Sequence, residues 1–309
     1  MSMQQMTQPA STPADIAHAQ QQVVRRLHTN NTIAIGILWA ITVFVVVLFI
    51  AIIVYLLIQG APALLSLSFY GTGATGIAAE LFNTFYILIL TEVILFPISL
   101  GAAIYLVEYA HQGRLVTIID FAAETLAGVP SIVLGLFGFA AFAVYGGFGI
   151  SRLAGALTLL CLNFPQALRL FEAALESVPG DLREGSLALG ASKWHAIRTV
   201  VLPSALPGIV TGLILTAGKI TGEAAALLFT MGLFNPVNVF TLNPLIASDT
   251  LTTRLYYLKG PGAGSTGLPF SQESILAAGI AAVLIVILLI INLSARSIGR
   301  LIERRLTAA

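Results

Sequence analysis

Long apolar stretches recur along this chain, and short polar connections separate them. Six stretches are long enough for a helix that crosses the hydrocarbon of a bilayer, which takes about 20 apolar residues. They cover residues 33–58, 81–107, 121–144, 153–170, 205–231 and 274–293. The fourth is the shortest and contains Asn163 and Pro165. The pattern therefore predicts an all-α integral membrane protein with six transmembrane helices.

The composition points to the same class. Of the 309 residues, 57% are hydrophobic and 9% are charged, whereas soluble domains carry about 25% charged residues. A chain so poor in charge cannot cover a water-facing surface, so we expect lipid to be its main solvent. The formal net charge is +1 and the sequence has no basic patch of the kind that binds nucleic acid, so we expect no nucleic-acid partner.

The polar ends divide the chain. Residues 1–30 are polar and rich in glutamine, so we expect them to form a disordered cytoplasmic tail. The apolar run that follows is too long for the core of a cleaved signal peptide, which has about 7–15 residues. We therefore expect a membrane domain over residues 31–298 and a cytoplasmic C-terminal tail over 299–309.

Basic residues are unevenly distributed among the connections, which indicates the orientation of the helices. Ten of them fall on one side: Arg25, Arg26, Arg114, Arg183, Lys193, Arg198, Arg296, Arg300, Arg304 and Arg305. The other side carries Arg152, Arg254 and Lys259. Because positive charge gathers in cytoplasmic loops, we expect both termini and the loop 171–204 to be cytoplasmic, and the loop 232–273 to be external.

The cytoplasmic loop carries the signals of two short helices. Asp181 can cap the first helix, with Glu184 three residues later in the capping-box position. Gly190 can end that helix in a left-handed conformation, and Ser192 can cap a second helix that leads into the fifth membrane segment. An amphipathic hairpin of this kind can dock into a groove on a soluble partner. The alternative is an ordinary amphipathic loop that lies on the membrane surface.

The spacing in this loop resembles the EAA loop of ABC importer permeases. That loop has an acidic and two small residues, three residues, a glycine, nine residues, an aliphatic residue, one residue, and Leu-Pro. Here the pattern reads Glu184-Gly185-Ser186, Gly190, Val200 and Leu202-Pro203. The chain departs from the family at Gly185 and Ser186, where alanines are common.

In that family the loop forms a coupling helix that sits in a cleft of the ATPase subunit. The resemblance implies this role for residues 182–193 and the architecture of a type I ABC importer permease for the chain. The residues expected to take part in coupling are Glu184, Gly185, Ser186, Leu187, Leu189, Gly190, Lys193, Trp194, Leu202 and Pro203.

Further stretches resemble the phosphate-uptake permeases, and their A-type subunit in particular. They are residues 103–110, 126–138, 190–194 and 222–228, and the similarity covers roughly residues 81–232, about half of the chain. The segment 129–133, Val-Pro-Ser-Ile-Val, is typical of this subunit type. The chain departs from the family around Phe164-Pro165 and at Gly218-Lys219, where Gly-Arg is usual, but Arg169 and Lys219 keep a positive charge at the matching places. The resemblance implies inorganic phosphate as the substrate.

Two charges in the fifth membrane segment point to a transport path. Lys219 lies four residues before Glu223, a spacing that places both on one face of a helix. A central ionisable side chain costs about 2.5–3.5 kcal/mol on insertion scales, so it normally faces a protein interior or a water-filled path. Nearby, we expect Gly212, Gly218 and Gly222 to let helices approach closely.

We therefore expect a transient anion path in which Lys219 attracts a phosphate oxyanion and Glu223 holds Lys219 in place. Arg169, at the cytoplasmic end of the fourth segment, would supply a second positive station. The alternative is a structural ion pair that fixes the packing of helices. Two further intramembrane acids, Glu92 and Glu124, are expected to be structural and to pair with Lys219 or with a neighbouring subunit.

The sequence has no pattern of its own for ATP hydrolysis. Walker motifs are absent, and the four histidines, His18, His28, His111 and His195, are scattered, which argues against a metal site. The lone Cys161 allows no intrachain disulfide and is best explained as a small buried hydrophobe. We expect no enzyme activity and no cofactor in this chain.

The resemblance implies how the chain would work and with which partners. These are a homologous second permease chain, two ATPase subunits that bind ATP and Mg, an extracytoplasmic phosphate-binding protein, and the lipid of a bacterial inner membrane. The implied mechanism is alternating access driven by the ATPase subunits. The alternatives are an ABC permease for another oxyanion or solute, an ion-coupled secondary transporter or channel without an ATPase, and a solely structural membrane protein.

Overall fold

The computed structural model describes residues 13–73, 75–110, 113–233, 240–260, 262–264 and 267–307. Within them the protein is all-α. The α-helices are α1 (Pro13–Leu64), α2 (Ala78–Ile104), α3 (Arg114–Ala127), α4 (Ser131–Gly138), α5 (Arg152–Glu176), α6 (Gly180–Ala188), α7 (Lys193–Ala196), α8 (Leu202–Gly222), α9 (Ala225–Thr230), α10 (Leu251–Lys259) and α11 (Phe270–Thr307). The short 3-10 helix η1 (Leu67–Tyr70) and the π-helical turns η2 (Tyr105–Tyr109), η3 (Phe139–Tyr145) and η4 (Ile197–Val201) complete the set.

The chain forms two units, Met1–Tyr55 and Leu56–Ala309. The described part of the first unit belongs to the single helix α1, whose apolar side chains over residues 33–50 are exposed, as expected of a helix that faces lipid. Because α1 begins at Pro13, part of the expected disordered tail is helical. Residues 14–27 contain alanine, glutamine, leucine and arginine, which are good helix formers, and α1 continues through the polar residues 28–32 into the apolar run. Residues 1–12 lie outside the described residues.

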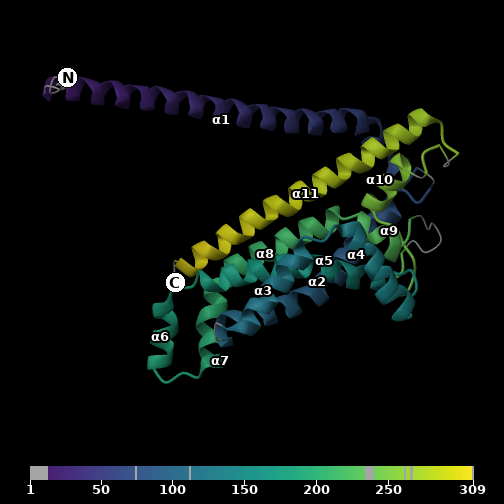
Figure 1. The fold of residues 1–309 in the computed structure, drawn as a ribbon. Coiled ribbons are helices and arrows are strands. Elements are labelled where there is room, and N and C mark those ends of the chain that lie inside the picture. The colour runs from purple at the N-terminus through teal and green to yellow at the C-terminus, as the bar shows by residue number, and fades with distance from the viewer. Residues whose placement is uncertain are drawn as a thin grey trace, which may run out of the picture. The chain divides into compact units, whose positions relative to one another are not determined.

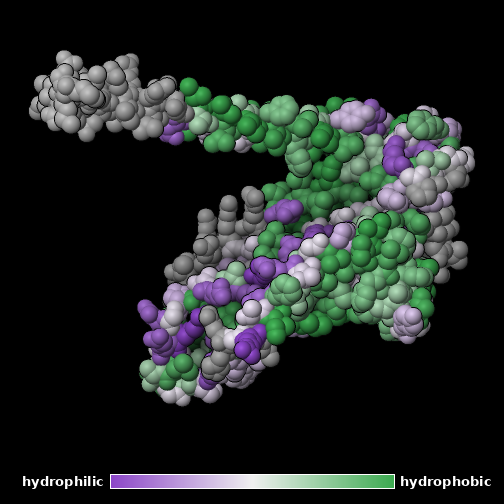
Figure 2. All heavy atoms as spheres, viewed as in Figure 1, coloured by the Kyte–Doolittle hydropathy of each residue, from purple (hydrophilic) through white to green (hydrophobic). Residues whose placement is uncertain are grey.

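The core of the second unit lies around α5. This helix packs against both α2 and α8, and α11 packs along α8 (Figure 1). Fully buried members of the core include Ile87, Leu95, Leu159, Leu168, Phe171 and Leu227. Hydrophilic residues gather over α6 and α7, whereas apolar residues cover much of the surface of the helices (Figure 2). Such a surface suits a hydrocarbon solvent.

Close helix contacts depend on particular glycines. A Cβ atom at Gly208 would lie 2.7 Å from the Cβ of Ala174, and one at Gly212 would lie 3.1 Å from the ring of Phe171, so these glycines let α8 approach α5. The prediction for Gly212 is confirmed. Gly218 and Gly222 have open space where a Cβ would stand, so the predicted role in close packing is wrong for them.

A smaller core joins the outer end of α1 to α10 and α11. It contains Ala63, Phe69, Ile77, Leu251, Leu258, Leu276 and Ile280. A Cβ atom at Gly60 would lie 2.8 Å from the carbonyl oxygen of Ala278, which shows how closely the end of α1 approaches α11. This cluster packs the segment around α10 against α11 and the end of α1.

Five described helices are long and apolar enough to cross a membrane, and a sixth span is formed if one bent pair is counted. That pair is Val116–Ala127 and Ser131–Tyr145, bent by 102° at Pro130. The segment predicted over 121–144 is thus interrupted where the sequence has Gly128 and Pro130, because Pro130 has no amide hydrogen and disfavours helix at the preceding residue. By contrast, α5 runs through Asn163 and Pro165 over 25 residues, which confirms the fourth predicted segment.

The predicted helix over 205–231 is also broken. The helix α8 ends at Gly222, Glu223 has an extended backbone (φ −77°, ψ 130°), and α9 begins at Ala225. Broken helices at membrane depth are tolerated where other groups satisfy the freed backbone atoms. The structure provides such groups, and they belong to the site.

Candidate functional site

The hairpin in the loop predicted to be cytoplasmic consists of α6, a turn at Gly190, and α7. Gly190 has φ +86°, and its amide donates to the carbonyl of Leu187 while the amide of Ala191 donates to Ser186. This pair of hydrogen bonds is the Schellman motif, which ends a helix with a left-handed residue. The hydroxyl of Ser192 accepts from the amide of His195 and caps α7. The predicted roles of Gly190 and Ser192 as helix end and helix cap are confirmed.

The predicted cap at Asp181 is wrong. The helix α6 starts earlier, with Pro179 at the N-cap and Gly180 as its first residue, and no side chain caps it. Asp181 instead lies in the first turn, where a negative charge interacts favourably with the helix dipole. Pro179 sets the start because its fixed backbone angle and missing amide hydrogen suit this position.

The hairpin presents apolar side chains to the outside. No residue of α6 is buried, and Leu182, Leu187, Leu189 and Trp194 are exposed, with Leu189 at 91%. Exposed leucines and a tryptophan on a short helical projection are typical of a surface that a protein partner covers. From α7 the chain continues through the π-helical turn η4 into α8, which begins at Leu202-Pro203.

Two basic residues attach the hairpin to the turn that follows the C-terminal end of α2. The Nε atom of Arg183 lies 3.2 Å from a carboxylate oxygen of Glu108, and Nη2 donates to the carbonyl of Leu175 at 2.6 Å. The Nζ atom of Lys193 lies 5.1 Å from the ring centre of Tyr109. Glu108 and Tyr109 are consecutive residues of η2, so both arms of the hairpin meet the same turn.

Lys219 and Glu223 do not form the expected pair. Because α8 ends at Gly222, the helical spacing of four residues does not apply across the break. The carboxylate of Glu223 accepts from the amide of Ala226 at 3.2 Å, and its carbonyl accepts from the hydroxyl of Thr252 at 2.8 Å. Lys219 is exposed and takes part in no ion pair within the described residues.

Arg169 lies in a separate, acid-rich cavity. It is half-exposed and forms an ion pair of 3.1 Å with Glu124 of α3. The cavity has a volume of about 430 Å³, and its polar lining is Asp120, Glu124, Arg169, Glu172 and Glu176. Neither Lys219 nor Glu223 lines it, so the structure does not bring the three predicted pathway residues together.

Glu92 joins α2 to α8 within the membrane. Its carboxylate accepts a hydrogen bond of 2.7 Å from the hydroxyl of Thr216, which is fully buried. The second oxygen of Glu92 is buried and has no hydrogen-bond partner in this structure. Within the described residues Glu92 therefore contacts Thr216 and forms no ion pair with Lys219; pairing with a neighbouring subunit stays a prediction.

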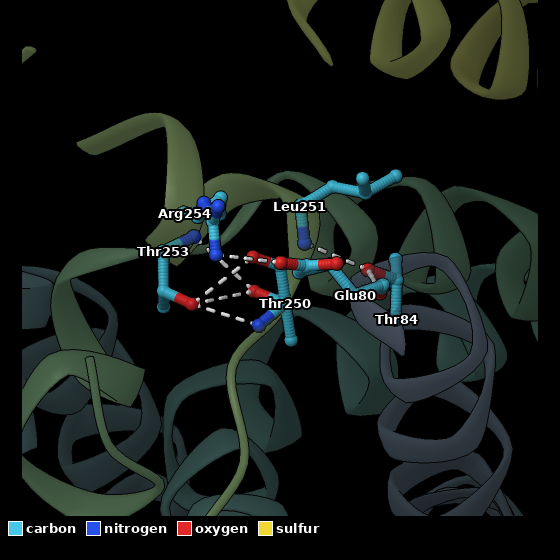
Figure 3. Close-up of polar contacts among 6 residues, drawn as sticks. All are labelled: Glu80, Thr84, Thr250, Leu251, Thr253 and Arg254. Atoms are coloured by element: carbon cyan, nitrogen blue, oxygen red, sulfur yellow. Dashed lines mark hydrogen bonds and ion pairs between the residues drawn. The ribbon is translucent and has the colours of Figure 1, made fainter. Parts of the chain in front are cut away.

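A buried polar cluster lies at the outer end of the helices. Arg254 of α10 donates to the carboxylate of Glu80 in α2 at 2.9 Å, and the hydroxyl of Thr84 accepts from the amide of Leu251 (Figure 3). Thr250 and Thr253 form a capping box at the start of α10. These contacts fix α10 to the first turns of α2.

Asp249 lies beside this cluster and is only 2% exposed. One of its carboxylate oxygens is buried without a hydrogen-bond partner. Burial, helped by the negative charge of Glu80 and opposed by Arg254, raises the pKa of the Asp249 carboxyl to about 7. This carboxyl can therefore hold a proton at neutral pH.

Arg152, at the start of α5, holds the external loop. The side chain is fully buried, and its guanidinium donates to the hydroxyl of Ser248, to the side chain of Asn83 and to the carbonyls of Thr241 and Asn243. It also lies 4.6 Å from the ring centre of a neighbouring tyrosine, at position 86. Neutral groups therefore satisfy this charge, and no described acid pairs with it.

The profile of the family described as "Binding-protein-dependent transport system inner membrane component" matches residues 94–308. This chain belongs to that family. It is a multi-pass permease of the bacterial inner membrane, and the resemblance read from its cytoplasmic loop is confirmed.

Curated relatives of the permease include proteins of phosphate transport systems. It is 37% identical over 295 residues to the probable ABC transporter permease protein YqgI of Bacillus subtilis, which covers 90% of this chain and 98% of the relative. It is 36% identical over 232 residues to the phosphate transport system permease protein PstA 1 of Mycobacterium tuberculosis, which covers 75% of this chain and 73% of the relative.

Solved structures show that the permease has the importer fold. The MetNI methionine ABC transporter in an inward facing conformation matches with a TM-score of 0.59 and 21% identity, over 73% of this chain and 95% of that chain. A bacterial ABC transporter involved in the import of alginate matches with a TM-score of 0.58 and 15% identity, over 91% of this chain and 99% of that chain.

Proposed function

We propose that this permease carries inorganic phosphate into the cell by alternating access, and that separate ATPase subunits drive it. One observation supports the coupling role: an exposed apolar hairpin, 180–196, lies between α5 and α8 and contains the spacing that resembles the EAA loop. Phosphate as substrate is supported by the relatives that are named phosphate permeases.

Within this proposal, the hairpin docks into a groove of the ATPase subunit. Leu187, Leu189 and Trp194 supply the apolar contact, and the Gly190 turn sets the angle between the two arms. ATP binding in the partner would pull the hairpin and rock the membrane helices between two states. Hydrolysis of ATP, with its Mg, belongs to the partner and not to this chain.

Lys219 remains the proposed station for the anion. It is an exposed cation on α8, one turn from the break at Gly222, and it has no ion-pair partner among the described residues. Arg169 is a weaker second station because Glu124 already neutralises it. Glu223 caps α9 and shapes the broken helix; it does not hold Lys219. A second, homologous permease chain would complete the path, and an extracytoplasmic binding protein would deliver phosphate.

The test is uptake of labelled phosphate by membrane vesicles that contain the permease with its native partners. We expect uptake that excess unlabelled phosphate abolishes and that Lys219→Gln reduces about tenfold or more, in line with the loss of a charge-assisted contact. Normal uptake by Lys219→Gln would remove Lys219 from the path. An intact complex whose wild type hydrolyses ATP but takes up no phosphate would refute the substrate.

A further inference from the structure

The attachment of the first arm of the hairpin, α6, to the membrane helices is polar, whereas Ala196 at the end of the second arm is buried. The first arm, α6, has no buried residue, so apolar packing of α6 does not hold it. Arg183 from that arm and Lys193 from the start of the second arm instead reach the adjacent residues Glu108 and Tyr109. The hairpin therefore meets the extension of α2 at two side-chain contacts.

The Arg183–Glu108 contact is the stronger of the two. Only 9% of the Glu108 side chain and 27% of the Arg183 side chain are exposed, so water screens this ion pair less than a surface pair. At 3.2 Å its geometry is that of an ion pair and not of an in-line hydrogen bond. Arg183 is held further by its hydrogen bond to the carbonyl of Leu175, a buried residue at the end of α5.

Glu108 lies in a π-helical turn that continues α2. π-Helical turns are rare overall, but those that occur are often found at functional sites. The extra residue in the turn loosens the helical hydrogen-bond pattern. The same helix contacts α8 through Glu92 and Thr216, and α10 through Glu80 and Arg254. A displacement of the cytoplasmic end of α2 would therefore act on its contact with α8 in the middle of the membrane and on its contact with α10 at the outer end.

We propose that the Arg183–Glu108 ion pair is the positioning contact that passes the ATPase-driven movement of the hairpin to α2. This inference rests on the proposed coupling role of the hairpin. Neither Arg183 nor Glu108 contacts the substrate in the proposed mechanism. Their function is to make α2 follow the hairpin, so that opening of the pathway and ATP hydrolysis stay linked.

The test uses charge reversal in the complete transporter, reconstituted in proteoliposomes with its second permease chain, ATPase subunits and phosphate-binding protein. Arg183→Glu and Glu108→Arg are each expected to lower the phosphate transported per ATP hydrolysed by about tenfold, within the range of typical coupling free energies. ATPase subunits should still co-purify, and hydrolysis should no longer respond to the binding protein. The double reversal should restore most of the ratio.

Arg198→Glu is the matched control, because Arg198 is an exposed arginine of η4 in the same cytoplasmic segment and is in no described ion pair. An unchanged transport ratio in both single reversals would overturn the inference. Loss of ATPase binding in the single reversals would also overturn the inference, because the ion pair would then only shape the surface that binds the ATPase.

Failure of the proposed substrate gives a different result. A wild-type complex whose hydrolysis responds to the binding protein, but which carries no phosphate, would refute phosphate alone. The ion pair is then tested by the response of ATP hydrolysis to the binding protein. If the single reversals abolish this response and the double reversal restores it, the inference is supported. If the single reversals leave the response unchanged, the inference is overturned.

Discussion

The hydroxyl of Thr252 donates a hydrogen bond of 2.8 Å to the backbone carbonyl of Glu223, and this contact joins α10 to the break between α8 and α9. On the other side of the break, the Glu223 carboxylate accepts from the amide of Ala226. Two backbone groups at the break, the carbonyl of Glu223 and the amide of Ala226, therefore have side-chain partners, as a helix interruption in a membrane requires.

Thr252→Val should weaken this break. The substitution keeps the size of the side chain and leaves the carbonyl of Glu223 without its donor, which costs about 1–3 kcal/mol of unfolding free energy for a buried group. Thermal unfolding of the purified permease in detergent measures the effect. Thr252→Ser keeps the hydroxyl and serves as the control; equal melting of the two variants would contradict the prediction.

Asp249 should make the stability depend on pH. Its pKa is raised from 3.8 to about 7, so the folded protein binds this proton more tightly than the unfolded chain does. The stabilising contribution is complete below about pH 4 and is lost as the pH rises through 7. Its full size is up to about 4 kcal/mol, from 1.36 kcal/mol per pKa unit.

Asp249→Asn should remove that dependence. The amide resembles the protonated acid, so the variant should melt at a higher temperature than the wild type at pH 8 and close to it at pH 4.5. Unfolding curves at both pH values test this. If the melting temperatures of the wild type and the variant change equally between pH 4.5 and pH 8, Asp249 does not carry the proton.

Gly190→Ala should disturb the hairpin. Its φ of +86° is a conformation that an L side chain adopts at a cost of roughly 1–2 kcal/mol, although the added Cβ itself would meet open space. We expect affinity for the ATPase subunit to fall about fivefold or more, measured by co-purification at several concentrations. Gly180→Ala is the matched control, because Gly180 also has open space and an ordinary φ.

Thr216→Val should expose the role of Glu92. It removes the 2.7 Å hydrogen bond that links α2 to α8, and leaving a buried polar group without its partner costs about 1–3 kcal/mol. A double-mutant cycle with Glu92→Gln, read by thermal unfolding, isolates the pair. A coupling energy near zero would show that the two residues act independently.

Much of the fold could be predicted because local sequence determines it. Length and hydropathy gave the membrane segments, and Pro130 and Gly190 have conformational preferences that act at their own positions. The break after Gly222 was missed because an apolar run contains no signal for a corner that a distant helix, α10, stabilises. The capping residues Thr250 and Thr253 were readable in principle as a helix start.

Only the part of the site that depends on local sequence could be predicted. The spacing of Gly190 and Leu202-Pro203 predicted the hairpin and the start of the next membrane helix, since these signals are local in the sequence; the coupling role of the hairpin stays a proposal. Glu108, Thr216 and Asp249 were not singled out, because each acquires its partner only in the folded chain. The predicted pairing of Lys219 with Glu223 is wrong because it assumes helical spacing across the end of α8 at Gly222.

The buried guanidinium of Arg152 also has a consequence for local unfolding. Its donors bind the segment 241–248, which has little regular secondary structure, to the first turn of α5 and to Asn83 of α2. The segment cannot leave without exposing a charge and several carbonyls that lose their donors. We therefore expect the segment to open together with the helix end as one cooperative unit, and its amides to exchange with solvent at the rate of that unit and not at the rate of a free loop.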